Sequence, residues 1–368
     1  MKRRFLHEAD AAVRWARANL FSGWLSALAT IAALVLFFRI SHVLLDWAVL
    51  GAAFGTTPES CKGISGACWS VIGDFWRIFL VGLYPQGERW RAYAALAAFA
   101  ILFFGAAVPG WRQSTIYRLA VLLLPLPLLL LLHGGFLGLP VVVTRYWGGL
   151  LITIGLAAIG LAVGIPLGIL IALGRTSKRL PIIKAGAILF VELVRSVPFV
   201  FILILGAIIL PMFLPPGLEI DPLLRVQVAI IIAAAANAAE IVRGGLASID
   251  SGQEEAAAAL GLGYWTTMSL VVLPQALRRM IPVFVNMFIS FLKDTSLVVV
   301  VGLFDLLGAA SLAVGNPDWI GRRIETLVFV ALIYFAMCWI VSRAGQTIET
   351  QNDWTAGKRA PTPALRAK

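Results

Sequence analysis

Long apolar runs dominate this sequence and restrict its fold more than any other feature. About eight of them approach the length of roughly 20 residues that a helix needs to cross a bilayer. The mean hydropathy is +0.91, with 60% hydrophobic and 13% charged residues, which is far outside the range of soluble proteins. The sequence therefore predicts an all-α polytopic membrane protein. The predicted spans are 20–38, 92–108, 119–139, 148–173, 196–214, 226–243, 281–303 and 326–343.

Two of these spans carry further local signals. Residues 40–54 continue the first apolar run beyond Arg39, either as more helix or as a segment at the membrane interface. The fourth span contains Gly160, Gly164 and Gly168, and small residues at this spacing let a second helix approach closely. A helix kinked at Pro166 is the alternative reading of the same run.

The basic residues predict how the spans are oriented. Lys and Arg are more than twice as frequent on the side that holds both termini as on the other side, and such loops are usually cytoplasmic. We therefore expect both termini and the loop at about 244–280 in the cytoplasm. The net charge of +11 follows this division, so it gives no reason to expect a nucleic-acid partner.

The cysteines suggest one covalent link. Cys61 and Cys68 share the polar loop at about 55–91, which this orientation places outside the cytoplasm, where disulfides persist. We expect either a disulfide between them or two free thiols. Cys338 lies in an apolar run and is expected to be a packing residue.

The polar stretch 251–274, SGQEEAAAALGLGYWTTMSLVVLP, separates the sixth and seventh spans. Ser251 and Glu254 have the spacing of a capping box, and Glu254 and Glu255 lie where the helix dipole favours acids. The alanines that follow favour a helix of about two to three turns, which would be marginal without a partner surface. The alternative is an ordinary interhelical loop.

The end of this short helix is also marked. Gly261 and Gly263 favour the left-handed conformation that terminates helices. Glu255-Ala256-Ala257 is followed after three residues by Gly261, and after nine more by Val271-x-Leu273-Pro274. This order and spacing resemble the EAA signature of ABC importer permeases.

Flanking residues narrow the resemblance. Asn237, Glu240 and Arg243 before the stretch, and Lys293-Asp294-Thr295-Ser296-Leu297 after it, resemble the polar amino-acid branch, the histidine/glutamate/glutamine/arginine/opine permeases. The resemblance holds from about residue 146 onward. The first 145 residues resemble only the extension of the longer, AapM-type general L-amino-acid permease subunits.

The resemblance implies a permease subunit of a binding-protein-dependent ABC importer for polar L-amino acids, multi-pass in the bacterial inner membrane. It implies a five-helix, MetI-like type I importer core at 146–345, with the coupling loop at about 244–280. An N-terminal extension at 1–145 would hold three transmembrane helices and a periplasmic loop. Residues 346–368 would form a loosely ordered cytoplasmic tail.

The implied partners are an ABC ATPase dimer that binds ATP and Mg, a periplasmic solute-binding protein, the lipid bilayer and a second permease subunit. The second subunit would be a related chain or a copy of this one. No G-x-x-x-x-G-K-[ST] loop and no metal-ligand spacing of histidines occur in the sequence. We therefore expect no enzyme activity, cofactor or metal in this chain itself.

The resemblance gives the short helix the role of coupling to the ATPase. Glu255 is expected to contact a basic group there, with Leu260 and Leu262 packing beside it. The alternative for Glu255 is an acid that only stabilises the helix dipole. The predicted coupling residues are Ser251, Gly252, Gln253, Glu254, Glu255, Ala256, Ala257, Leu260, Gly261 and Leu262.

Polar residues inside the spans predict a substrate path. Asn286, Ser290 and Lys293 have i, i+4, i+7 spacing, which places them on one helix face. Lys293 would face the carboxylate of an amino acid, and Asp294 or Glu240 would face its ammonium group. The predicted path residues are Asn237, Glu240, Asn286, Ser290, Lys293, Asp294, Thr295 and Ser296.

Structural roles are the alternatives for these charges, because intramembrane charges also pair with one another. Lys293 would then pair with an acid, and Glu240 with Arg243 at i+3. Two other functions stay open at this point. An ion-gradient-driven secondary transporter would need inverted repeats and coupling carboxylates, and a non-transporting sensor or assembly subunit would have its main working part in the N-terminal spans.

Overall fold

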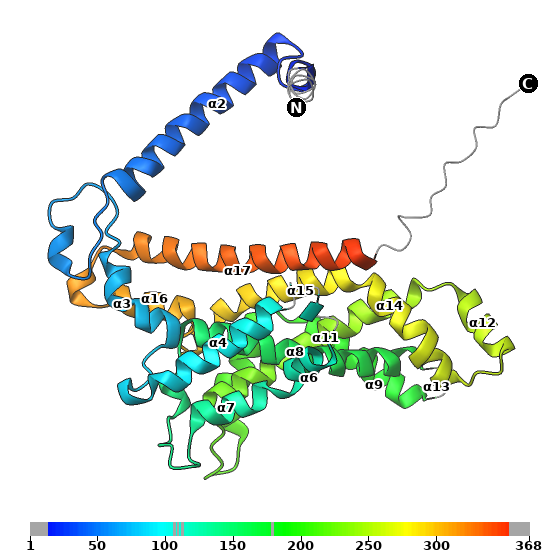
Figure 1. Cartoon of the computed structure of the whole chain (residues 1–368). Helices are drawn as coiled ribbons and strands as arrows, with labels where there is room; N and C mark the ends of the chain where they lie inside the picture. Colours follow the sequence, from blue (N-terminus) through cyan, green and yellow to red (C-terminus); the bar gives the residue numbers. More distant parts are fainter. Residues whose placement is uncertain (1–13, 106–107, 109, 112–113, 178–179, 353–368) are drawn as a thin grey trace, which may run out of the picture. The chain divides into compact units, whose positions relative to one another are not determined.

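The computed structural model describes residues 14–105, 108, 110–111, 114–177 and 180–352. These residues form helices joined by short loops (Figure 1), and within these ranges the only β-pairing is two isolated bridges. The predicted all-α class is confirmed. The chain divides into two compact units, residues 1–74 and 75–368, and the predicted extension at 1–145 therefore contributes to both.

The helices are arranged along the chain as follows. The elements are α2 (Trp24–Leu45), η1 (Asp46–Leu50), η2 (Pro58–Cys61), α3 (Ser70–Val81), η3 (Gln86–Glu88), α4 (Arg89–Gly105), α6 (Thr115–Leu123), α7 (Pro125–His133), η4 (Thr144–Tyr146), α8 (Gly149–Thr176), α9 (Pro181–Ser196), α10 (Phe199–Ile204), η5 (Leu205–Ile209), η6 (Leu210–Phe213), α11 (Pro222–Ala247), α12 (Ser251–Ala259), α13 (Tyr264–Thr267), η7 (Met268–Val272), α14 (Leu273–Arg279), α15 (Ile281–Asp294), η8 (Thr295–Val301), α16 (Leu306–Val314), η9 (Pro317–Trp319) and α17 (Arg323–Asn352).

The first unit contains one long apolar helix. Helix α2 continues through η1, so the helical segment runs from Trp24 to Leu50 with a hydropathy of 2.1. None of its residues is buried within the chain. Arg39 does not interrupt it, so residues 40–50 continue the helix, whereas residues 51–54 lie beyond its end and contain an isolated bridge at Ala53. A helix that is apolar all round and uncovered by protein is suited to contact with lipid.

The loop after this helix is held together covalently. Cys61 and Cys68 form a disulfide, with their Cα atoms 5.6 Å apart. Trp69 Nε1 donates a hydrogen bond to the Ala48 carbonyl at 2.8 Å, and its ring lies edge-on to Trp47 with the centroids 6.0 Å apart. These contacts fold the loop back onto the end of the helical segment.

Five helical segments in the described residues are long and apolar enough to cross a membrane, and two bent helix pairs raise this number to seven. The pair formed by α6 and α7 bends by 44°, and the pair Pro181–Ser196 and Phe199–Phe213 bends by 104°. Helix α4, with 17 residues, is about 26 Å long at 1.5 Å per residue, which is close to the lower limit for a span. It corresponds to the second predicted span.

The sharper bend follows from a proline. Pro198 precedes α10 with φ −56° and ψ 139°, and a proline both lacks the N–H that would continue the helix and pushes the residue before it toward extended backbone. The sequence predicts a span at 196–214, which has Pro198 at its entry. The structure adds that α9 is the other arm of the same bent pair.

The second unit is organised around α8 and α11. A Cβ atom added to Gly164 would lie 2.6 Å from the Ala234 Cβ, and one added to Gly168 would lie 2.5 Å from the Ala238 Cβ. Only glycine permits this approach, because real Cβ contacts are not this short. The predicted close packing of the Gly160–Gly164–Gly168 face is confirmed, and its partner is the alanine-rich face of α11.

Helices α4 and α7 pack beside α8 and are tied together by Arg91. This guanidinium is fully buried, donates to the carbonyls of Leu131 and Pro140 at 3.3 and 3.1 Å, and pairs with Glu88 at 3.0 Å. Tyr84 donates to the Leu132 carbonyl at 2.6 Å. Burial raises the pKa of the Tyr84 hydroxyl, which therefore stays protonated as a donor.

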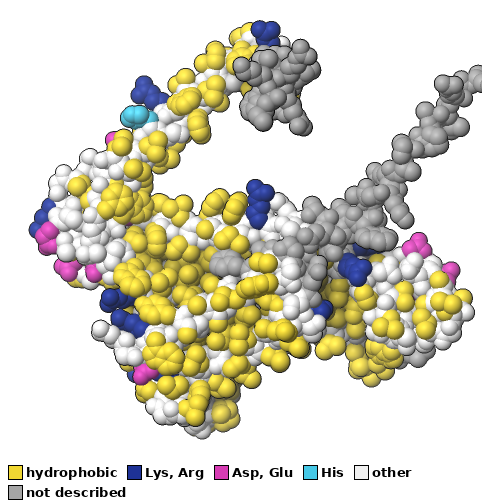
Figure 2. Space-filling view, in the orientation of Figure 1, with side chains coloured by type: hydrophobic (Ala, Val, Ile, Leu, Met, Phe, Trp, Pro, Cys, Tyr) yellow, Lys and Arg dark blue, Asp and Glu magenta, His cyan; other side chains and the backbone are white. Residues whose placement is uncertain are grey.

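The surface of the chain suits a hydrocarbon environment. Figure 2 shows hydrophobic side chains covering most of the visible face of the helices, with few charged side chains among them. The last helix, α17, continues to Asn352, so residues 346–352 are helical rather than loosely ordered as the sequence suggested. The rest of the predicted tail, 353–368, and the basic residues before position 14 lie outside the described residues.

Candidate functional site

Helix α12 is the short helix that the stretch 251–274 predicts, and it lies at one end of the second unit beyond α13 and α14 (Figure 1). It has nine residues, within the expected two to three turns. Its cap differs from the expectation. Asp250, not Ser251, is the N-cap, and its carboxylate accepts from the Gly252 N–H at 2.7 Å.

The predicted capping box of Ser251 and Glu254 is therefore wrong by one residue. A carboxylate at the N-cap satisfies a free N–H as a hydroxyl does and in addition interacts favourably with the helix dipole. At the other end Gly261 has φ +76°, as expected for a helix stop. Gly263 has φ −71° and precedes α13 in extended conformation, so the left-handed expectation for it is wrong.

Few contacts hold α12 to the rest of the unit. Ala257 is its only buried residue, and Gln275 of α14 donates a hydrogen bond to Gln253 at 3.0 Å. Behind the helix, Arg279 donates to the Ser248 carbonyl. The remainder of α12 is available to a partner.

The predicted coupling residues mostly face away from the protein. Glu254 and Glu255 are exposed, Leu260 is 81% exposed, and Leu262 is half-buried. Beyond the helix, Trp265 is 68% exposed. Of the remaining members of the set, Ser251, Gln253, Ala256 and Gly261 are exposed, Gly252 is half-buried and Ala257 is buried. The exposed surface combines two carboxylates with large apolar side chains.

The polar residues of the seventh span do form one stripe. Asn286, Ser290 and Lys293 are all exposed on α15, whereas Met287 and Phe291 between them are buried. Among the described residues, no ion pair to Lys293 and no hydrogen bond between Ser290 and Asp294 is present. The stripe therefore lies on a face that this chain does not cover by itself.

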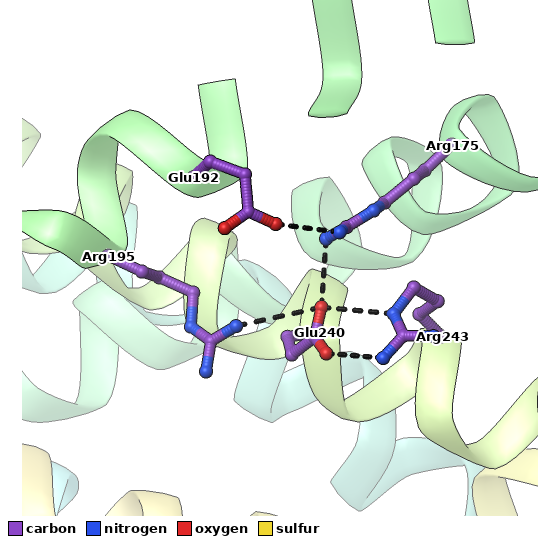
Figure 3. A network of polar contacts seen from close by, with 5 residues as sticks. All are labelled: Arg175, Glu192, Arg195, Glu240 and Arg243. Carbon is purple, nitrogen blue, oxygen red and sulfur yellow. Dashed lines mark hydrogen bonds and ion pairs between the residues drawn. The ribbon is translucent and has the colours of Figure 1, made fainter. Parts of the chain in front are cut away.

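Glu240 belongs to a different arrangement, a cluster of five charged side chains (Figure 3). Its carboxylate accepts from Arg243 Nη2 at 2.5 Å and from Arg243 Nε at 3.1 Å. Arg175 Nη1 approaches it at 2.8 Å and Arg195 Nη1 at 3.6 Å. Arg175 also contacts Glu192, at 2.7 Å. The Glu240–Arg243 pair left open by the sequence is present, and both carboxylate oxygens are occupied by guanidinium groups.

This charged cluster joins three helices. Arg175 is close to the end of α8, Glu192 and Arg195 lie on α9, and Glu240 and Arg243 lie on α11 (Figure 3). The sequence showed each charge but not their convergence. Three arginines against two carboxylates leave the cluster with an excess of one positive charge.

Removing the central carboxylate is expected to destabilise this junction. In Glu240→Gln, three guanidinium groups would lose their common anion, and Arg175 is only 15% exposed. We expect a loss of about 2 kcal/mol in the free energy of unfolding, less than for a fully buried pair because the site is partly solvated. Thermal unfolding of the purified chain measures this loss of stability.

Glu192→Gln is the matched control, because the Glu192 carboxylate forms an ion pair with Arg175 alone and is 60% exposed. An equal loss of stability in both variants would contradict the central role of Glu240.

Two of the remaining path residues, Asn237 and Thr295, are hydrogen-bonded within the chain. Asn237 Nδ2 donates to the Ala233 carbonyl one turn earlier at 2.9 Å. Thr295 is buried and donates to the Leu292 carbonyl at 2.7 Å. Asp294 and Ser296 are half-buried. The structure thus places Asn286, Ser290 and Lys293 on one exposed face of α15, and Glu240 in the charged cluster of α8, α9 and α11.

A buried group of hydrogen-bonded polar residues around Asp305 was not predicted from the sequence. Asp305 is fully buried, caps α16 through Gly308 N at 2.9 Å and accepts from the Tyr334 hydroxyl at 3.1 Å. Thr153 Oγ1 accepts from the N–H of the next residue, Leu306, at 3.0 Å. An Asp directly before an apolar helical run is a known start signal, and it would have identified this cap. The group joins α8, α16 and α17.

The comparisons with known proteins agree with this architecture. The profile of the family described as "binding-protein-dependent transport system inner membrane component" matches residues 164–350. The inner membrane amino-acid ABC transporter permease protein YhdY of Escherichia coli (strain K12) is 41% identical over 354 residues, which cover 93% of this chain and 94% of YhdY.

Two further relatives are similar. The glutamate/glutamine/aspartate/asparagine transport system permease protein BztC of Rhodobacter capsulatus is 33% identical over 406 residues, covering 92% of this chain and 93% of BztC. A solved structure described as an amino acid ABC transporter with histidines is 32% identical, with a TM-score of 0.50, over 55% of this chain and 92% of that one. The chain therefore belongs to the amino-acid ABC transporter permeases, within the family of binding-protein-dependent transport system inner membrane components.

Proposed function

We propose that this chain is the transmembrane permease subunit of an ABC importer for polar L-amino acids. The observation that carries the proposal is the 41% identity to an amino-acid ABC transporter permease along 93% of the chain. BztC, whose name gives glutamate, glutamine, aspartate and asparagine as its substrates, supports the polar amino-acid class. The secondary-transporter and sensor alternatives lack support of this kind.

Helix α12 would couple the chain to a separate ATPase. It is exposed along most of its length and is attached through Ala257 and Gln253. The exposed side chains of Glu255, Leu260 and Trp265 would contact the ATPase. Such a surface fits a groove that has an apolar floor and a basic rim. ATP and Mg would be bound by the partner, and the chain itself would carry out no chemistry.

The stripe on α15 would line the translocation path. Its three polar residues are uncovered in the single chain, and uncovered polar groups within a membrane span are costly unless they face protein or a water-filled cavity. A second permease subunit, either a related chain or a copy of this one, would face the stripe. Lys293 would then offer a positive charge to the carboxylate of an amino acid, which a periplasmic binding protein would deliver.

Transport would use two arrangements of these helices. Closure of the ATPase pair would shift α12, and the contacts that differ between the two states would move the path from one side of the membrane to the other. The excess of Lys and Arg supports a cytoplasmic position for both termini and for α12. The solute-binding protein would dock on the opposite side.

Co-purification tests the proposal. The tagged full-length chain would be expressed with the ATPase and permease encoded beside it and purified in mild detergent, and its ATPase activity would be measured with and without the binding protein and amino acids. We expect an ATPase to co-elute and its activity to rise with loaded binding protein. If no ATPase binds and uptake into liposomes follows an ion gradient, the chain is a secondary transporter.

Neutralising Lys293 is expected to impair transport without unfolding the chain. Loss of a charge-assisted contact to the substrate carboxylate costs about 1.5–3 kcal/mol, or about 10–150-fold in apparent affinity for the amino acid. Lys293 is exposed and has no ion pair among the described residues, so Lys293→Met should leave the unfolding temperature almost unchanged. Amino-acid uptake by the reconstituted complex measures the effect. Lys293→Arg, which keeps the positive charge, should retain most of the uptake activity. Normal uptake by a less stable Lys293→Met variant would indicate a structural role instead.

A further inference from the structure

A cavity of about 300 Å³ lies between the extension helices and the core of the second unit. Phe99 of α4 and Leu129 of α7 contribute one side, and Leu151, Gly155 and Leu156 of α8 contribute the other. This volume is at the lower end of the range found for small-molecule sites. A space of this size with apolar walls is not filled by water, because water there would find too few hydrogen-bond partners.

The cavity has one polar end. Thr144 Oγ1 donates to the Asp221 carboxylate at 2.5 Å, and Asp221 in turn accepts from the backbone N–H of Leu223 at 2.9 Å. His133, the last residue of α7, also lines the cavity. These three residues stand at helix ends. The lining also contains Gln227, inside α11, whose amide donates to the Leu156 carbonyl at 3.5 Å, and the rest of it is largely apolar. The polarity therefore changes along the cavity as it does from the headgroups to the acyl chains of a bilayer.

The rim of the cavity is apolar and uncovered. Leu130 is 52% exposed and Leu224 is 54% exposed, and both line the cavity. Each belongs to a helix that is apolar enough to lie in the membrane. In a bilayer an apolar rim of this kind would face acyl chains, which makes a hydrocarbon chain the occupant that this environment supplies.

We propose that this cavity binds one acyl chain of a membrane phospholipid, with its headgroup at the His133, Thr144 and Asp221 end. An amino acid is a poor occupant because the deep walls offer its ammonium and carboxylate groups almost no partners. A chain in the cavity gains close packing that the loosely ordered bilayer does not provide, since an unfilled space forfeits dispersion contacts. The lipid would thereby join the extension helices to the core. This inference requires only that the chain is embedded in a membrane and does not depend on what it transports.

Gly155 provides a way to block the cavity. A Cβ atom built on it meets only Phe99 Cε2, at 3.9 Å, which is ordinary contact. A leucine at this position would extend into the cavity and compete with the acyl chain. Gly186 on α9 is a matched control, because a Cβ atom there meets nothing within 4 Å and it does not line the cavity.

Native mass spectrometry of the full-length chain in mild detergent tests the proposal. The chain, purified from membranes with any co-eluting subunits, is expected to retain a phospholipid that survives gentle activation. In Gly155→Leu the fraction of protein that retains a phospholipid should fall at least tenfold. In Gly186→Leu this fraction should equal that of the unaltered chain. Both variants should keep or raise the unfolding temperature, because each replaces a helical glycine.

Three results would overturn the proposal: no retained phospholipid on the unaltered chain, a bound mass equal to that of the detergent, or equal retention in Gly155→Leu and Gly186→Leu. If Gly155→Leu proves less stable, Gly155→Ala is the second variant, because its methyl group extends less far into the cavity. It should retain phospholipid on an intermediate fraction of the protein. An unchanged fraction in Gly155→Ala together with loss only in an unstable Gly155→Leu would also count against a cavity-bound lipid.

Discussion

Reversing the charge of Glu255 is expected to uncouple the chain from its ATPase. In Glu255→Lys an exposed carboxylate would be replaced by a cation opposite a basic groove, and losing one partner of such an interfacial pair costs about 2–5 kcal/mol, equivalent to about thirtyfold or more in affinity. Co-elution of the ATPase and transport by the reconstituted complex should both fall by at least this factor. Titration of the purified ATPase onto the chain in nanodiscs measures the affinity directly.

Glu254 provides the control for this experiment. It is also exposed and lies in the first turn of α12, nearer than Glu255 to the positive end of the helix dipole. Glu254→Lys should therefore disturb the helix at least as much as Glu255→Lys, while it leaves the contact proposed for the Glu255 carboxylate in place. Equal loss of ATPase binding in both variants would mean that Glu255 only stabilises the helix start.

A bulky residue at Gly164 is expected to give the largest loss of stability. In Gly164→Leu the new side chain would meet the Ala234 Cβ, and its first atom would already lie 3.2 Å from the Ala235 backbone nitrogen. Backbone atoms cannot move aside as a flexible side chain can. We expect a loss of about 3 kcal/mol, at the upper end of the usual range for overpacked sites, measured by thermal unfolding in detergent.

Gly155 again gives the comparison, because it lies on the same helix and has space beside it. Gly155→Leu should not be destabilising, so the difference between the two variants isolates the close approach of α8 and α11. A stable Gly164→Leu variant would mean that these helices separate easily, and that their packing is not what organises the unit.

The sequence predicted the features that arise from local pattern. Spans are predictable because each must be apolar over the thickness of the membrane, and the glycine face of α8 because small residues recur at the helical period. The stripe of Asn286, Ser290 and Lys293 follows from the same periodicity. The short helix α12 was predictable from its alanines and its flanking Gly261.

Features that depend on distant partners were not predictable. Glu240, Arg175 and Arg195 come from three helices, and no local pattern tells which charges will meet. The cap of α12 was misplaced because Asp250 and Ser251 are both good N-caps, and only the backbone conformation decides between them. The cavity depends on the sizes of side chains from α4, α7, α8 and α11 together, and such complementarity is not visible in any one segment.

The buried Arg91 imposes an order on membrane insertion. Its two carbonyl partners are made 40 and 49 residues later in the chain, which corresponds to a delay of about 2–10 s at ordinary rates of synthesis. During this interval Glu88 is the nearest counter-charge, and the start of α4 must stay close to the membrane surface where water solvates the guanidinium. The guanidinium of Arg91 can therefore reach its buried position only after α7 and Pro140 have emerged, which links the docking of α4 to that of α7.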